Sequence, residues 1–140
     1  MQRHTVYAHF PTEDELFRAC AGHWSDAHPF PDPAGWAAIA DPEARSRRAL
    51  DELYRWYELV EHDLILFTRD AEAIPEQTAE TDAQLHALRE LSAAGRPQRR
   101  AVRAAIGHGL EFETWRSLVR RQGLSRRAAV DAIVRLAGSL

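Results

Sequence analysis

The stretch HTVYAHFPTEDELF, residues 4–17, decides how the start of this chain folds. Its first half predicts a short helix over residues 3–9 that ends at Pro11, because proline cannot continue a helix. Thr12 then begins a second helix. Its hydroxyl can cap the first turn, and Glu15 three residues later completes a capping box. The stretch therefore predicts two helices joined by a tight turn.

The rest of the chain also predicts helices, separated by proline and glycine, with no Val/Ile/Thr alternation that would indicate a strand. We expect long helices over residues 12–28, 42–62, 75–93, 97–122 and 125–138. We also expect one turn near residues 35–39 and a shorter helix over 64–68, after a bend at 61–63. Gly95 and Gly123 are expected to end helices. The predicted fold class is an all-α bundle of about six to seven helices.

Composition limits the classes of protein to consider. The chain has 140 residues, 45% of them hydrophobic, which suffices for one domain with a core. The formal charge of −3 disfavours a surface that binds nucleic acid over its whole extent. No apolar run reaches the length of a membrane span, and the N-terminus does not resemble a secretory signal, so we expect a cytoplasmic protein that does not enter membranes. Cys20 is the single cysteine, which excludes an internal disulfide and a CxxC zinc site.

The last two predicted helices carry unusually wide apolar surfaces. On the first of them, Ile106 and Leu110 share one face, whereas Trp115 falls in a different sector. On the second, apolar residues cover most of the circumference. A central helix buried on all sides would explain this pattern, but we favour a helix between its own core and a second copy of the chain. The residues expected at a homodimer interface are Ile106, Leu110, Trp115, Leu118, Ile133 and Leu136.

The opening stretch resembles the end of the DNA-binding domain of TetR-type transcriptional regulators. In that family the recognition helix ends in a similar string, and here Tyr7, His9, Phe10, Thr12 and Leu16 match it in register. The remaining residues resemble the family only in the number and lengths of their helices. The resemblance implies a helix-turn-helix head and an all-α domain that binds a small molecule. It also implies dimerisation through the last two helices as a four-helix bundle.

Polar side chains early in a recognition helix reach base edges, and tyrosine or histidine can donate to phosphate oxygens. In an intact regulator, the resemblance assigns these contacts to Arg3, His4, Thr5, Tyr7 and His9. The family usually has Lys or Arg where this chain has Glu13. With Asp14 and Glu15 beside it, that position would repel a DNA backbone.

The family also has two further helices before this string, where this sequence has only Met1 and Gln2. We therefore interpret residues 1–11 as the remnant of a recognition helix, and residues 12–140 as a helical ligand-binding and dimerisation domain. A seven-residue helix is too short to persist alone in water. We expect the 140-residue polypeptide to bind operator DNA weakly or not at all, with operator DNA a partner of the full-length form only.

Aromatic side chains recur on several predicted helices, as is typical of a small-molecule cavity inside a bundle. The resemblance implies an effector in such a cavity, and the aromatic lining indicates a small apolar or aromatic one. The expected lining residues are Phe17, Cys20, Trp24, Tyr54, Tyr57, Phe67, His108 and Phe112. His108 is the leading candidate for a polar contact. Simple filling of the core remains an open alternative for each of them.

The sequence predicts no enzyme, cofactor or metal site. None of the seven histidines follows a glutamate by three residues, as a di-iron bundle requires. Cys20, His23 and His28 could ligate a metal, but no fourth ligand is evident. Arginines near the last helices, Arg100 and Arg103 among them, are interpreted as solvated helix rims. The predicted function is a TetR-type regulator, a repressor that senses a small molecule and dimerises. The alternatives are a ligand-binding or sequestering helical module without a DNA role and a small helical enzyme.

Overall fold

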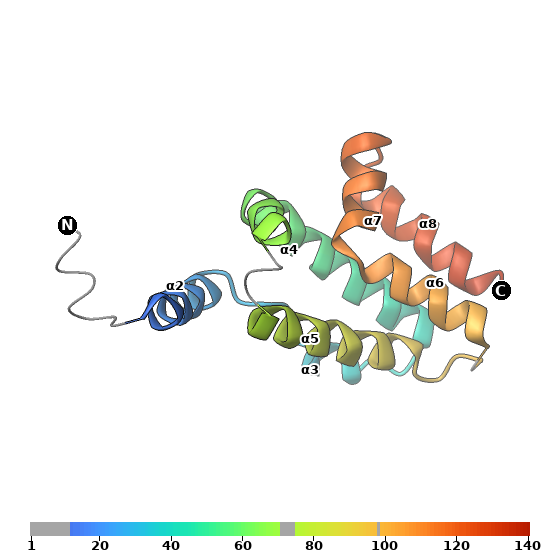
Figure 1. The fold of residues 1–140 in the computed structure, drawn as a ribbon. Helices are drawn as coiled ribbons and strands as arrows, with labels where there is room; N and C mark the ends of the chain where they lie inside the picture. Colours follow the sequence, from blue (N-terminus) through green and yellow to red (C-terminus); the bar gives the residue numbers. More distant parts are fainter. Residues whose placement is uncertain (1–11, 71–74, 98) are drawn as a thin grey trace. The chain divides into compact units, whose positions relative to one another are not determined.

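The computed structural model describes residues 12–70, 75–97 and 99–140, and over these ranges it contains helices and loops but no strand (Figure 1). The expected all-α fold of about six to seven helices is confirmed. The chain divides into two compact units, Met1–Phe30 and Pro31–Leu140. The short helix predicted over residues 3–9, and with it the whole segment 1–11, lies outside the described residues.

The first unit contains α2, Glu13–Ala27, whose start follows the predicted capping box. The backbone N–H of Glu15 donates to Thr12 Oγ1 at 3.2 Å, and the N–H of Thr12 donates to Glu15 Oε2 at 3.3 Å. The helix ends at His28, whose N–H donates to the carbonyl of Trp24 at 2.9 Å. Pro29 follows and cannot continue the ladder. Both predicted ends of this helix are confirmed.

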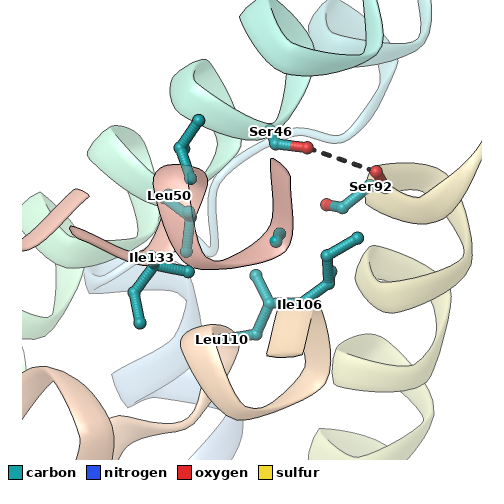
Figure 2. Close-up of a pocket in the computed structure, with 8 residues that line it drawn as sticks. Ser46, Leu50, Ser92, Ile106, Leu110 and Ile133 are labelled. Atoms are coloured by element: carbon teal, nitrogen blue, oxygen red, sulfur yellow. Dashed lines mark hydrogen bonds between the residues drawn. The ribbon is translucent and has the colours of Figure 1, made fainter. Parts of the chain in front are cut away.

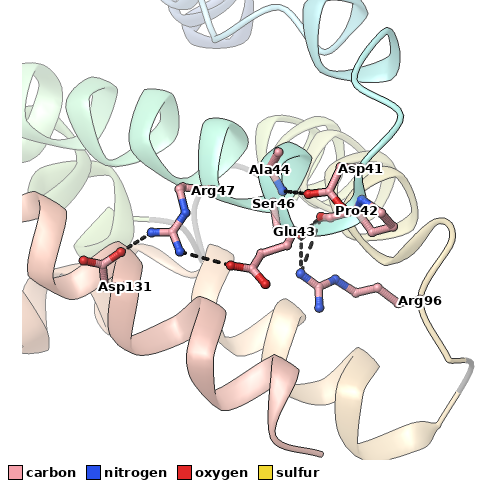
Figure 3. Close-up of polar contacts among 8 residues, drawn as sticks. All are labelled: Asp41, Pro42, Glu43, Ala44, Ser46, Arg47, Arg96 and Asp131. Carbon is pink, nitrogen blue, oxygen red and sulfur yellow. Dashed lines mark hydrogen bonds and ion pairs between the residues drawn. The ribbon is translucent and has the colours of Figure 1, made fainter.

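The second unit is built around α4 and α6, and both α5 and α8 pack against each of them. Its elements are α3 (Ala34–Ala37), α4 (Pro42–Asp70), α5 (Pro75–Ala93), α6 (Arg100–Leu110), α7 (Phe112–Arg116), a π-helical turn η2 (Ser117–Arg121) and α8 (Arg126–Gly138). Figure 1 shows α5, α6 and α8 running beside α4. Asp41 caps α4, because its Oδ2 accepts from the N–H of Ala44 at 2.7 Å (Figure 3).

Helix α4 runs unbroken to Asp70, so the bend predicted at residues 61–63 is wrong. After Pro42 the helix contains neither proline nor glycine, and nothing interrupts its hydrogen-bond ladder. Its inward face is apolar. The fully buried apolar residues of this face are Ala49, Leu50, Leu53, Tyr54, Tyr57 and Val60.

The single helix predicted over residues 97–122 is also wrong, because the chain breaks at Glu111 (φ −74°, ψ 140°). The carbonyls of Gly109 and Leu110 lie at the end of α6, and the hydroxyls of Tyr54 and Tyr57 donate to them at 2.7 and 2.6 Å. Two glycines within α6 lower its helix propensity near this end. On one continuous helix, Trp115 would fall in a different sector from the apolar face of α6. Because the chain breaks at Glu111, α7 turns and Trp115 is fully buried.

Arg45 joins three segments of the second unit from a position only 8% exposed. Its Nε donates to the carbonyl of Ile39 at 2.9 Å and its Nη2 to that of Ala40 at 3.1 Å. Its Nη1 donates to the carbonyls of Leu91 and Ala94 at 3.3 and 2.8 Å. These last two carbonyls lie at the C-terminal end of α5, where the helix dipole favours a cation.

Ion pairs join α4 to the C-terminal elements. Arg126 donates to Asp51 at 2.9 Å and to Glu58 at 2.8 Å. Arg47 bridges Asp131 of α8 and Glu43 of its own helix (Figure 3). The hydrogen bond to Asp131 is the main cause that raises the pKa of Arg47, and the hydrogen bond to Asp51 does the same for Arg126.

Helix α8 buries one face and exposes the other. Ala129, Ile133 and Val134 face the core, whereas Arg135 and Leu136 are exposed. A helix buried on all sides is therefore not what this chain forms. A second copy against the exposed face remains a prediction.

Candidate functional site

Three of the residues predicted to line a ligand pocket come together in the core, but as a packed aromatic cluster. The ring of Tyr57 lies 6.3 Å from that of Tyr54, 5.3 Å from that of Phe112 and 5.8 Å from that of Trp115. The rings of Phe112 and Trp115 stack at 5.5 Å. The two tyrosine hydroxyls already donate to backbone carbonyls of α6, and burial raises the pKa of both. These tyrosines therefore support the end of α6 and do not present free polar groups to a ligand.

A small apolar void lies nearby, between α4, α5, α6 and α8 (Figure 2). It is lined by Ser46, Leu50, Ser92, Ile106, Leu110, Ile133, Val134 and Ala137. At its rim, Ser46 Oγ donates to the carbonyl of Ser92 at 3.2 Å. The void measures about 10 Å³, close to the space that one water occupies, whereas small-molecule sites measure roughly 300–1,000 Å³. In this conformation it does not admit an organic effector.

Of the other predicted pocket residues, Phe67 belongs to the second unit and Phe17, Cys20 and Trp24 belong to the first. Phe67 is half-buried near the C-terminal end of α4. The rings of Trp24 and His28 lie 4.9 Å apart and are tilted by 31° to each other, and Cys20 is exposed. For Phe17 the structure describes the backbone alone. These last residues belong to the first unit, so their part in a shared pocket remains a prediction.

His108 faces outward, and its side chain is 64% exposed. Its Nδ1 lies 3.6 Å from Glu111 Oε2 and 3.2 Å from Thr114 Oγ1. It lies at the edge of an open groove of about 420 Å³ on the outer side of α5 and α6. The predicted polar contact of His108 with a ligand would therefore occur in this groove and not in the bundle core.

The groove is strongly charged. Its lining residues are His86, Arg89, Glu90, Arg100, Arg103, Ala104, Gly107, His108 and Glu111. Arg103 pairs with Glu90 across the two helices. Arg89 packs against Gly107, where a Cβ would stand 2.7 Å from the Arg89 Nε. The sequence interpretation treated Arg100 and Arg103 as solvated rims. It missed the groove because nothing in the sequence fixes which residue of α5 lies opposite Gly107.

Four residues predicted at a dimer interface belong to the chain's own core instead. Ile106, Leu110, Trp115 and Ile133 are at most 5% exposed, so they offer no surface to a second copy in this conformation. The two apolar sectors noted on the predicted helix over residues 97–122 arise from the break at Glu111. Of the remaining two, Leu118 is half-buried, and Leu136 is 45% exposed.

In the described part of the chain, no three histidine, cysteine or acidic side chains gather as a metal site would require. None of the described helices combines the length and apolarity needed to cross a membrane. Comparison with protein-family models, with curated proteins and with solved structures finds no match for this chain. The fold and its geometry therefore define the class as an all-α helical bundle with an open, charged groove.

Proposed function

We propose that this chain is the effector-sensing and dimerising part of a TetR-type transcriptional regulator, acting as a repressor in the cytoplasm. One observation carries the proposal: the string from Tyr7 to Leu16 matches the end of the family's recognition helix in register. The capping box of Thr12 and Glu15 supports it, since it begins a helix where the family string requires one. The all-α bundle that follows is compatible with the family's sensing domain.

The mechanism would be coupling between two sites. An effector that binds one conformation of the bundle better than the other shifts the population toward it. In a dimer, that shift changes the spacing of two DNA-binding heads, and the effector and DNA then weaken each other's binding by the same factor.

Dimerisation would use the surface that α8 and its neighbours leave exposed, and a stable two-fold interface buries at least ~1,000 Å² in total. Leu136 lies on that surface, and Leu59, 74% exposed on α4, provides a matched control outside the last two helices. Sedimentation velocity at tens of micromolar should show a dimer. Leu136→Glu should convert it to monomer, whereas Leu59→Glu should leave it dimeric. A monomeric unmodified chain would contradict the proposed interface.

The three carboxylates Glu13, Asp14 and Glu15 at the start of α2 favour a second candidate, a sequestering helical module without a DNA role. The genomic reading frame upstream of Met1 separates the two candidates. A preceding helix pair with a glycine turn, in the same frame, would support the regulator. A stop codon directly upstream would support the module and refute the regulator.

A further inference from the structure

We propose that the groove between α5 and α6 is a binding site for a small organic anion, held by Arg89, Arg100 and Arg103. The inference rests on the groove's own geometry and does not depend on the proposed function. It also differs from the sequence expectation of an apolar effector in the core, where the void admits about one water.

The guanidinium of Arg89 has no hydrogen-bond acceptor among the residues that the structure describes. Its Nε is buried without a hydrogen-bond partner. The guanidinium fits there because residue 107 is a glycine. A Cβ at position 107 would stand 2.7, 3.2 and 3.3 Å from Nε, Cζ and Cδ of Arg89. The two terminal nitrogens lie farther from that point. The terminal nitrogens, unlike Nε, are not among the buried unpartnered atoms, so a carboxylate or phosphate in the groove could accept hydrogen bonds from them.

Charge is unevenly balanced along the groove. Arg100 lies in the first turn of α6 and pairs with no carboxylate in the described part of the chain. Arg103 stands one turn further along and shares Glu90. No side chain caps the start of α6, and its first turn holds no acidic residue, so the positive helix end adds to the arginines. Among the described residues that line this end of the groove, Arg89, Arg100 and Arg103 are basic and Glu90 is acidic.

The length of the groove indicates the size and polarity of the ligand. From Arg100 to Gly107, α6 rises about 10 Å, at 1.5 Å per residue over seven residues. One small ion cannot contact this whole length, whereas an organic molecule with two or more anionic groups can. Glu111 and His108 form the opposite end, where a hydroxyl or amine of the same ligand would find an acceptor. The ligand class is therefore a hydroxylated or aminated polycarboxylate or phosphate ester.

Isothermal titration calorimetry on the 140-residue chain tests the site, with citrate, pyrophosphate and inorganic phosphate as probes in separate arms. Citrate or pyrophosphate should bind with one site per chain and a submillimolar Kd, and inorganic phosphate more weakly. Tighter citrate would indicate a carboxylate ligand, and tighter pyrophosphate a phosphate ester. Arg100→Gln should weaken binding about ten- to a hundredfold, the loss expected for one charge-assisted hydrogen bond.

The matched control is Arg127→Gln, because Arg127 is an exposed arginine of α8 outside the groove. It should change Kd by less than about twofold. Arg89→Gln should weaken binding at least as much as Arg100→Gln. The thermal midpoint of the Arg89→Gln variant is measured as well, to distinguish a loss of binding from a loss of folding. Absence of binding by all three probes would overturn the proposal, and so would equal losses in Arg100→Gln and Arg127→Gln.

Discussion

Replacing Arg45 by methionine should destabilise the second unit more than any exposed substitution. Methionine keeps much of the apolar stem but removes all donors, so the four carbonyls that Arg45 contacts, from Ile39 to Ala94, lose their partner. Burial at 8% exposure prevents water from replacing it fully.

The magnitude follows from the number and kind of bonds. A hydrogen bond to a charged donor contributes about 1.5–3 kcal/mol, and Arg45 makes four such bonds. Part of their total is offset, because the variant no longer has to remove a guanidinium from water on folding. We expect a loss of about 3–5 kcal/mol in the free energy of unfolding. For a domain of this size, 1 kcal/mol corresponds to about 4 °C, so the thermal midpoint should fall by about 12–20 °C.

Thermal and urea unfolding followed by circular dichroism at 222 nm measures the effect. Arg55→Met is the matched control, because Arg55 is an exposed arginine on the same helix. It should change the free energy of unfolding by less than about 0.5 kcal/mol. Arg45→Lys should fall between the two, since one ammonium cannot span both groups of carbonyls. If Arg45→Met stayed within about 1 kcal/mol of the unmodified chain, the assigned role of Arg45 would be wrong.

Other substitutions test the contact between α6 and its neighbours. A Cβ at Gly109 would stand 2.3 Å from Ile133 Cγ2. Gly109→Ala should therefore lower the free energy of unfolding by about 1–3 kcal/mol, measured by urea unfolding. Gly138→Ala is the control and should not lower it, because a Cβ there meets open space. Tyr57→Phe should lower the free energy of unfolding by about 1–2 kcal/mol, measured in the same way, because the Leu110 carbonyl loses its donor. Burial raises the pKa of both buried tyrosines, Tyr54 and Tyr57, above the ordinary 10.0, so unfolding releases their protons at alkaline pH. The two tyrosines should not affect the free energy of unfolding below pH 10, and above pH 10 each should lower it by about 1.4 kcal/mol per pH unit. Absorbance at 295 nm should show that neither tyrosine ionises at pH 10 in the folded chain. Ionisation of both at that pH would contradict their burial.

Much of the fold could be predicted from local signals. The Thr12–Glu15 capping box, Asp41 before Pro42 and the positive-φ glycines at 95 and 123 all mark helix ends, and the structure confirms each. These signals work because they depend on residues within one turn of each other. The spacing of buried residues on α4 was predictable for the same reason.

The break at Glu111 could not be predicted, because its cause lies far away in the sequence. The Tyr54 and Tyr57 hydroxyls that satisfy the end of α6 come from another helix, more than fifty residues earlier. The separate sectors of Ile106 and Trp115 were noticed without predicting a break, and a second copy of the chain was invoked to explain the wide apolar surface of the last helix. The groove was missed for a similar reason, since the pairing of Arg89 with Gly107 depends on the tertiary packing of α5 on α6.

The measurement that tests the proposed function most directly is an electrophoretic mobility shift with DNA from the gene's own promoter. Two polypeptides are compared: the product of the reading frame extended upstream of Met1, and residues 1–140. The account predicts a tight, sequence-selective complex for the extended product and weak or no binding for residues 1–140. A tight, selective complex with residues 1–140, or no complex with the extended product, would contradict it.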